Sequence, residues 1–225
     1  MSEYLKNFIA AEGAKLKGMT LKEKAVYIWE YYKIPIIAAV VILFIAGSII
    51  NSVWINPPKK LYLQIAFYGG YVDDSSLSAL CGNIEEAVMT PEERETLQVT
   101  GTYFMLDSGD PQMDMASSQK FMAMIAVQEL DLLVASQEEL GFLAYQNMLL
   151  PLRDILPDSQ MSQYSDKLVS APDESGAELE YAIKLDGNRL FIDNGIMDEG
   201  QCLAVVINNM RQDNARRAIE HIFNS

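Results

Sequence analysis

Aromatic and polar side chains follow three segments that have the composition of buried strands. The first segment is followed by Tyr-Gly-Gly-Tyr and two aspartates, the second by Asp-Ser-Gly-Asp, and the third by Ser-Gln. Tyrosine rings can stack on the ring of a ligand, and carboxylates can accept hydrogen bonds from its hydroxyl groups. In an open α/β sheet, ligands bind beyond the carboxyl ends of the strands. We therefore predict a ligand or partner site formed by Tyr68, Tyr71, Asp73, Asp107, Asp110 and Ser136.

The same residues also have a simpler interpretation. Glycine, aspartate and serine are common in the turns that join strands to helices, whatever those turns bind. Asp107 or Asp110 can cap the helix that follows instead of contacting a ligand. The sequence leaves both interpretations open.

Few residues of the chain are suited to catalysis. His221 is the only histidine, and the sequence contains no Gly-x-Ser-x-Gly, His-Glu-x-x-His or phosphate-loop motif. The run that starts with Asp186-Gly-Asn begins like a calcium loop, but Leu190 and Phe191 occupy positions that need an oxygen ligand and a glycine. We therefore predict a protein that is not an enzyme and that holds no metal or cofactor.

The apolar pattern predicts that these turns belong to an α/β fold. Strands are expected at 61–68, 97–106 and 130–135, and helices at 75–89, 115–129 and 138–147. Strands that alternate with helices favour a parallel-rich sheet with helices on both faces. Further along the chain we expect a loop with one helical turn at 151–177 and a hairpin of 181–185 and 190–192 around Asp186-Gly187-Asn188. A strand at 202–207 and a helix at 213–223 follow.

The order of these segments resembles that of extracellular solute-binding proteins of the sugar-binding class. The resemblance is carried by Glu-Leu-Asp-Leu-Leu-Val-Ala-Ser at 129–136, Leu-Leu-Pro-Leu-Arg-Asp-Ile-Leu at 149–156, Tyr-Ala-Ile-Lys-Leu at 181–185, and the strand and helix at 204–208 and 215–223. Lys184 stands where the family strand has a proline. The second lobe of such proteins would be inserted at 157–180, where 24 residues are too few for a domain. The resemblance therefore implies a single periplasmic-binding-protein-like lobe without a closing cleft.

Two functions fit a lobe of this kind. The first is that of a non-enzymatic interaction module, which contacts a partner protein of the cell envelope through the surface that a second lobe would cover. The alternative is weak binding of a small polar solute such as a sugar at the strand ends, in a role linked to transport. Sugar binding would use the tyrosines and carboxylates named above.

A membrane anchor is predicted before this lobe. Residues 34–55 contain no charged residue, and as a helix these 22 positions would extend about 33 Å, enough to cross a bilayer core. The segment could instead be a buried helix or a cleaved signal peptide. An aromatic belt at its flanks argues against the buried helix, and the 33 residues before it are too many for the start of an ordinary signal peptide, so a retained transmembrane helix is favoured. The residues of this belt are Tyr27, Trp29, Tyr31, Tyr32 and Trp54.

The distribution of lysines predicts the orientation of this anchor. Five lysines lie close before the span and two close after it, so the positive-inside rule places residues 1–33 in the cytoplasm. These residues are expected to form an amphipathic juxtamembrane segment, with a helix at 2–17 and a capping box formed by Thr20 and Glu23. That segment could lie on the lipid surface or dock a cytoplasmic partner. Residues 56–60 then form a linker, and residues 61–225 form the extracellular domain.

The exported part of the chain is strongly acidic. Residues 56–225 contain 27 acidic and 11 basic side chains, which makes nucleic acid an improbable partner. The same part contains the only two cysteines, Cys81 and Cys202. The sequence leaves open whether they form a disulfide or remain as buried thiols.

Overall fold

The chain divides into two compact units in a computed structural model. The structure describes residues 3, 13–14, 17–55, 57–106, 108–207 and 209–224. The two units are Met1–Pro58 and Lys59–Ser225, and each is described by itself below.

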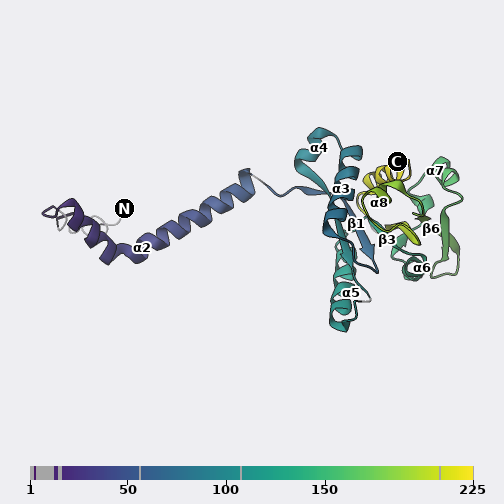
Figure 1. The fold of residues 1–225 in the computed structure, drawn as a ribbon, viewed down its shortest axis with the longest axis horizontal. Helices are drawn as coiled ribbons and strands as arrows, with labels where there is room; N and C mark the ends of the chain where they lie inside the picture. The colour runs from purple at the N-terminus through teal and green to yellow at the C-terminus, as the bar shows by residue number, and fades with distance from the viewer. Residues whose placement is uncertain are drawn as a thin grey trace. The chain divides into compact units, whose positions relative to one another are not determined.

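A long helix dominates the first unit (Figure 1). Helix α2, Leu21–Ile50, continues into the π-helical turn η1, Asn51–Ile55. The predicted capping box starts it: the Thr20 hydroxyl accepts from the Glu23 amide, and the Glu23 carboxylate accepts from the Thr20 amide at 2.8 Å. Among the described residues, Leu21–Val53 is the one helix long and apolar enough to cross a membrane, and its apolar window is not buried in protein.

The residues of the predicted aromatic belt lie mainly at the start of this helix. The Tyr27 ring lies 4.7 Å from the Tyr31 ring and 6.4 Å from the Tyr32 ring, measured between centroids. Trp29 is 63% exposed on the same helix. The side chain of Trp54 and nearly all of the predicted helix at 2–17 lie outside the described residues.

The described part of the second unit forms a mixed sheet of seven strands, in the order β2-β1-β3-β7-β6-β5, with β4 also pairing with β7. Strand β1, Lys60–Tyr68, is parallel to its neighbours β2, Leu97–Phe104, and β3, Leu132–Ser136. The strands on the other side are antiparallel: β7 is Gln201–Val206, β6 is Glu178–Lys184, β5 is Leu168–Pro172 and β4 is Leu149–Leu150. The sheet is therefore mixed: β1, β2 and β3 are parallel as predicted, but four of the six described pairings are antiparallel, so the prediction of a parallel-rich sheet is wrong.

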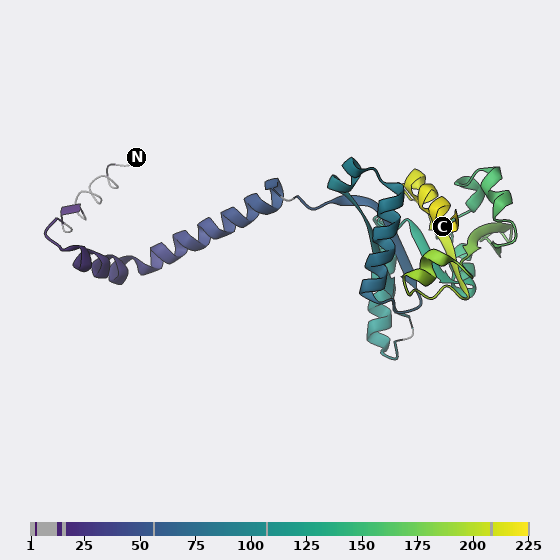
Figure 2. The same cartoon turned by 45° about the horizontal axis from the view of Figure 1, so that its top comes forward.

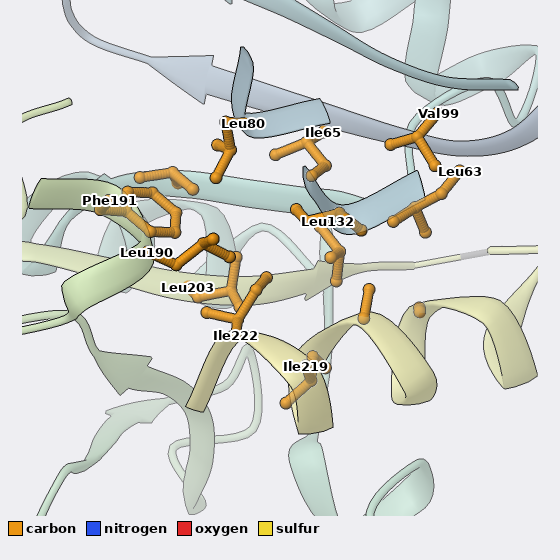
Figure 3. Close-up of a cluster of buried hydrophobic side chains, with 14 of the residues drawn as sticks. Leu63, Ile65, Leu80, Val99, Leu132, Leu190, Phe191, Leu203, Ile219 and Ile222 are labelled. Carbon is orange, nitrogen blue, oxygen red and sulfur yellow. The ribbon is translucent and has the colours of Figure 1, made fainter. Parts of the chain in front are cut away.

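Helices cover both faces of this sheet, as predicted (Figure 2). On one face, α3, Asp74–Val88, α8, Arg189–Asp193, and α9, Gln212–Asn224, pack on alternate side chains of the central strands. Figure 3 shows this core, in which Ile65 of β1 lies beside Leu132 of β3, and Ile222 of α9 lies beside Leu203 of β7. The other face is covered by α5, Pro111–Ala126, and α6, Gln137–Tyr145, through residues such as Phe121.

Two sequence expectations are wrong in the second half of the unit. Residues 190–192 belong to helix α8 and not to a hairpin, because the Asn188 side chain caps that helix by accepting from the Phe191 amide at 3.2 Å. The segment expected to be a loop with one helical turn, 151–177, contains two helical elements, the 3₁₀ turn η2, Leu152–Asp154, and the helix α7, Asp158–Gln163, and also strand β5. A further short helix, α4, Pro91–Thr96, precedes β2.

A buried ion pair holds one end of the sheet together. The Asp131 carboxylate is fully buried just before β3 and accepts from the Arg211 Nε at 2.8 Å and from the Gln64 amide at 2.8 Å. The Arg211 guanidinium also donates to the carbonyls of Gln128 and Glu129, both at 3.1 Å. These bonds join the starts of β3 and α9 to the middle of β1.

The two cysteines lie on opposite faces of the sheet. Cys81 belongs to the core under α3, and Cys202 to the core under α5 and α6. Both are free, and burial raises the pKa of the Cys81 thiol to about 12 and that of the Cys202 thiol to about 11. The sheet therefore separates two inert core thiols.

Candidate binding pocket

A pocket of about 420 Å³ lies at the carboxyl ends of β1 and β3. Four of the six predicted site residues line it, namely Tyr68, Tyr71, Asp73 and Ser136. Asp110 does not line it; its carboxylate accepts from the Gln112 amide at 2.9 Å and caps α5, as the simpler interpretation expects. Asp107 lies outside the described residues.

The chain can turn into this pocket because the residue after β1 is a glycine. Gly69 has a φ of +106°, and its amide donates to the Phe104 carbonyl at 3.0 Å, which extends the pairing with β2. A side chain at this position would collide with the Glu139 carboxylate, whose Cδ lies 2.8 Å from where a Cβ would stand. Gly69 therefore allows an acidic side chain to lie directly against the backbone of the turn.

That acidic side chain is held by the start of α6. Oε2 of Glu139 accepts from the Ser136 amide at 2.9 Å and from its hydroxyl at 2.8 Å, while Ser136 Oγ accepts from the Glu139 amide. This capping box fixes both side chains in the pocket wall. Glu139 is not among the site residues predicted from the sequence, although the Ser-x-x-Glu spacing at 136–139 is a readable signal for it.

Asp73 places a second carboxylate at the pocket. Its Oδ1 caps α3 by accepting from the amides of Ser75 and Ser76 at 3.0 and 3.2 Å and from the Ser75 hydroxyl. These bonds, the Ser75 hydroxyl first, lower the pKa of Asp73 below its ordinary value. The carboxylate therefore stays ionised at neutral pH.

The two tyrosines differ in how firmly they are held. The Tyr68 ring packs 4.4 Å from the Phe121 ring, and desolvation, followed by the nearby Glu139, raises its pKa. The Tyr71 ring meets the Tyr103 ring edge-on at 5.1 Å but is 62% exposed. Desolvation and then Asp73 raise the pKa of Tyr71 as well, so both hydroxyls remain protonated hydrogen-bond donors at neutral pH.

The opposite wall comes from the segment between α8 and β7 and from the first residue of β7, none of which was predicted from the sequence. It contributes Gly195, Ile196, Met197 and Gln201 to the lining. The Asn83 side chain on α3 donates to that of Asn194 at 3.0 Å and so ties this wall to the helix that starts at the pocket. Met197 is 70% exposed at the rim. Because residues 190–192 read as a strand, no sequence signal placed this segment near β1.

The described lining of the pocket is acidic. It contains Asp73 and Glu139 and no lysine, arginine or histidine. The Ser136 hydroxyl is engaged in helix capping, and no group of three or more potential metal ligands occurs among the described residues. His221 lies on α9, outside the pocket lining.

No family model, curated protein or solved structure matches the chain. The resemblance to solute-binding proteins therefore stays a prediction from the sequence.

Proposed function

We propose that the protein is a membrane-anchored, non-enzymatic interaction module whose second unit receives an envelope protein at the pocket between β1, β3 and the α8–β7 segment. The observation that carries the proposal is the exposure of two large side chains at the rim of the pocket. Tyr71 is 62% exposed and Met197 70% exposed, beside a lining that offers hydrogen-bonding groups. Tyrosine and methionine are enriched at the centres of protein interfaces, so two such side chains exposed at the rim of one pocket favour a protein partner there.

The anchor and the charge of the chain support the location of this module. Helix α2 has the length and composition of a membrane span, and the lysine bias favours an extracellular second unit. Its excess of acidic residues disfavours nucleic acid as a partner. A reporter that is active only outside the cytoplasm, fused after Ser225, should be active in membranes that retain the full-length protein. An inactive fusion or a shortened soluble product would contradict this topology.

The alternative function is weak binding of a small polar solute, such as a sugar, in the same pocket. A volume of about 420 Å³ falls in the range of small-molecule sites. The exposed rim favours the protein partner, because high-affinity small-ligand sites bury most of the ligand surface. We expect no sugar to bind the full-length protein more tightly than about 100 µM, or about −5.5 kcal/mol.

Photo-cross-linking tests the proposal directly. The cross-linking residue p-benzoylphenylalanine replaces Tyr71 in one variant of the full-length protein and Met197 in another. Each variant is produced in the cells that naturally contain the protein, and these cells are then illuminated. The matched control position is Met210, which is 74% exposed beyond the other end of β7. We expect one adduct of discrete mass from positions 71 and 197 and none from 210. Equal adducts from all three positions, or no adduct from the two pocket positions, would contradict the docking site. A sugar that binds with a dissociation constant below 1 µM would favour the alternative function.

A further inference from the structure

We infer that the pocket recognises a cationic group, the ammonium of a lysine or the guanidinium of an arginine, on the partner protein. This inference rests on the proposed function and names the chemistry by which the partner is recognised. It follows from the state of the two carboxylates, the tyrosine at the mouth and the charge of the surrounding unit.

Within the part of the chain that the structure describes, each of the two carboxylates accepts hydrogen bonds through one oxygen. The bonds that Glu139 accepts from Ser136 go to Oε2, and those that Asp73 accepts from Ser75 and Ser76 go to Oδ1. Neither carboxylate forms an ion pair with a described lysine or arginine. The second oxygen of each remains for a ligand, and a charged donor forms stronger hydrogen bonds to such oxygens than a neutral hydroxyl does.

The position of Glu139 makes this site more than a group of acidic surface residues. Its carboxylate lies against Gly69 at the point where the turn leaves β1, and the capping box fixes its rotamer. A ligand donor that reaches it enters a cavity instead of meeting a mobile surface side chain. Charge pairs in partly desolvated sites are screened less by salt than exposed pairs are.

Tyr71 adds a second attraction for cations. Its ring is anchored edge-on by Tyr103 and is largely exposed at the pocket mouth. The face of a tyrosine ring attracts ammonium and guanidinium groups through the negative charge of its π-system. The methylene groups of a lysine or arginine side chain can at the same time pack on Met197 and Ile196 in the opposite wall.

The charge of the whole unit acts in the same direction. Residues 56–225 carry 27 acidic and 11 basic side chains, and the described pocket lining adds no basic group. The resulting field raises the local concentration of cations and repels anions. A basic side chain of a partner is therefore favoured over a neutral sugar hydroxyl.

Two model ligands test this chemistry on the full-length protein in non-ionic detergent. These are N-acetyl-lysine-methylamide and its uncharged norleucine counterpart, with binding measured by saturation-transfer NMR. We expect at least a tenfold preference for the lysine derivative. Glu139→Gln should weaken its binding about tenfold while retaining the capping box, because glutamine also serves at that position. Glu138→Gln removes the same charge from the neighbouring exposed residue and should change binding less than twofold.

The cross-linking experiment separates the possible failures. If the adduct from position 71 persists unchanged in Glu139→Gln and the lysine derivative shows no preference, the cationic chemistry is wrong while the docking site stands. If no discrete adduct forms, the docking function fails. If the lysine derivative still binds in that case, the pocket is a receptor for free amines, and the proposal that the cationic group belongs to a partner protein is wrong. An adduct lost in Glu139→Gln but kept in Glu138→Gln supports both proposals.

Discussion

The acidic residues at the two ends of strand β3 differ in burial and in charge pairing. Before the strand, Asp131 is fully buried and paired with Arg211 at 2.8 Å. After it, Glu139 is half-buried and has a helix cap as its support, with no described basic partner. The paired carboxylate can only hold the fold together, whereas the unpaired one is available to a ligand. The comparison predicts large effects on stability at the first end and effects on binding at the second.

The largest expected effect comes from breaking the buried ion pair. Arg211→Met leaves the Asp131 carboxylate buried without its cation, which costs about 3–5 kcal/mol in comparable pairs. We expect the low end of that range, because the Arg211 side chain is 20% exposed. Urea unfolding of the detergent-solubilised protein measures the change. Arg216→Met is the control: it removes an exposed pair with Asp213 and should cost less than about 0.5 kcal/mol.

The pH dependence of that effect identifies Asp131 as its cause. Burial raises the pKa of Asp131 above its ordinary value of 3.8, and the bonds to Arg211 oppose this rise. The folded state therefore holds the proton more tightly than the unfolded state, so the contribution of Asp131 to stability falls as pH rises from 3.8 through the raised pKa. Without Arg211 that window extends to higher pH.

We accordingly expect the stability deficit of Arg211→Met to be smaller at pH 5 than at pH 7. Unfolding midpoints of the variant and the parent at both pH values measure the deficit. In the Asp131→Asn background, where no carboxylate titrates at this position, the deficit that Arg211→Met adds should not change with pH. A deficit that is equally large at both pH values in the single variant would show that lost packing, and not the charge, is responsible.

An intermediate effect on stability is expected at the turn after β1, where Gly69 lies against Glu139. Gly69→Ala places a side chain at a φ of +106° and against the Glu139 carboxylate, so it should destabilise the protein by about 1–3 kcal/mol. It should also weaken binding of the lysine derivative by displacing Glu139. Gly70→Ala is the matched control, since nothing lies within 4 Å of its Cβ position. Equal thermal stability of the two variants would contradict the role of Gly69.

The parts that the sequence predicted are those determined by local pattern. Strand β1 and helix α3 follow from an apolar run, a glycine turn and an aspartate cap, and the same pattern placed Tyr68, Tyr71 and Asp73 together. Strand β7 is buried on both faces, so its apolar run looks the same whether it is parallel or antiparallel to β3. Three apolar residues at 190–192 cannot distinguish a helix from a strand.

The remaining errors concern contacts between distant segments. Arg211 and Asp131 are 80 positions apart, and no local spacing relates them. The wall formed by Met197 and Gln201 depends on where α8 packs, which the sequence did not reveal. Glu139 was different, because its capping box could be read locally and was overlooked.

The smallest expected effect on stability should accompany the largest effect on docking. Tyr71 is 62% exposed, so Tyr71→Ala loses mainly its edge-on contact with Tyr103 and should cost no more than about 1 kcal/mol. The same change removes the aromatic face at the pocket mouth and should abolish the adduct from position 197. Tyr145→Ala removes a comparably exposed tyrosine, 57% exposed on α6 outside the pocket lining, and should leave that adduct intact. If both variants keep the adduct, Tyr71 is an ordinary surface residue. The residues at the two ends of β3 then differ only in how much they contribute to stability, and not in a role in binding.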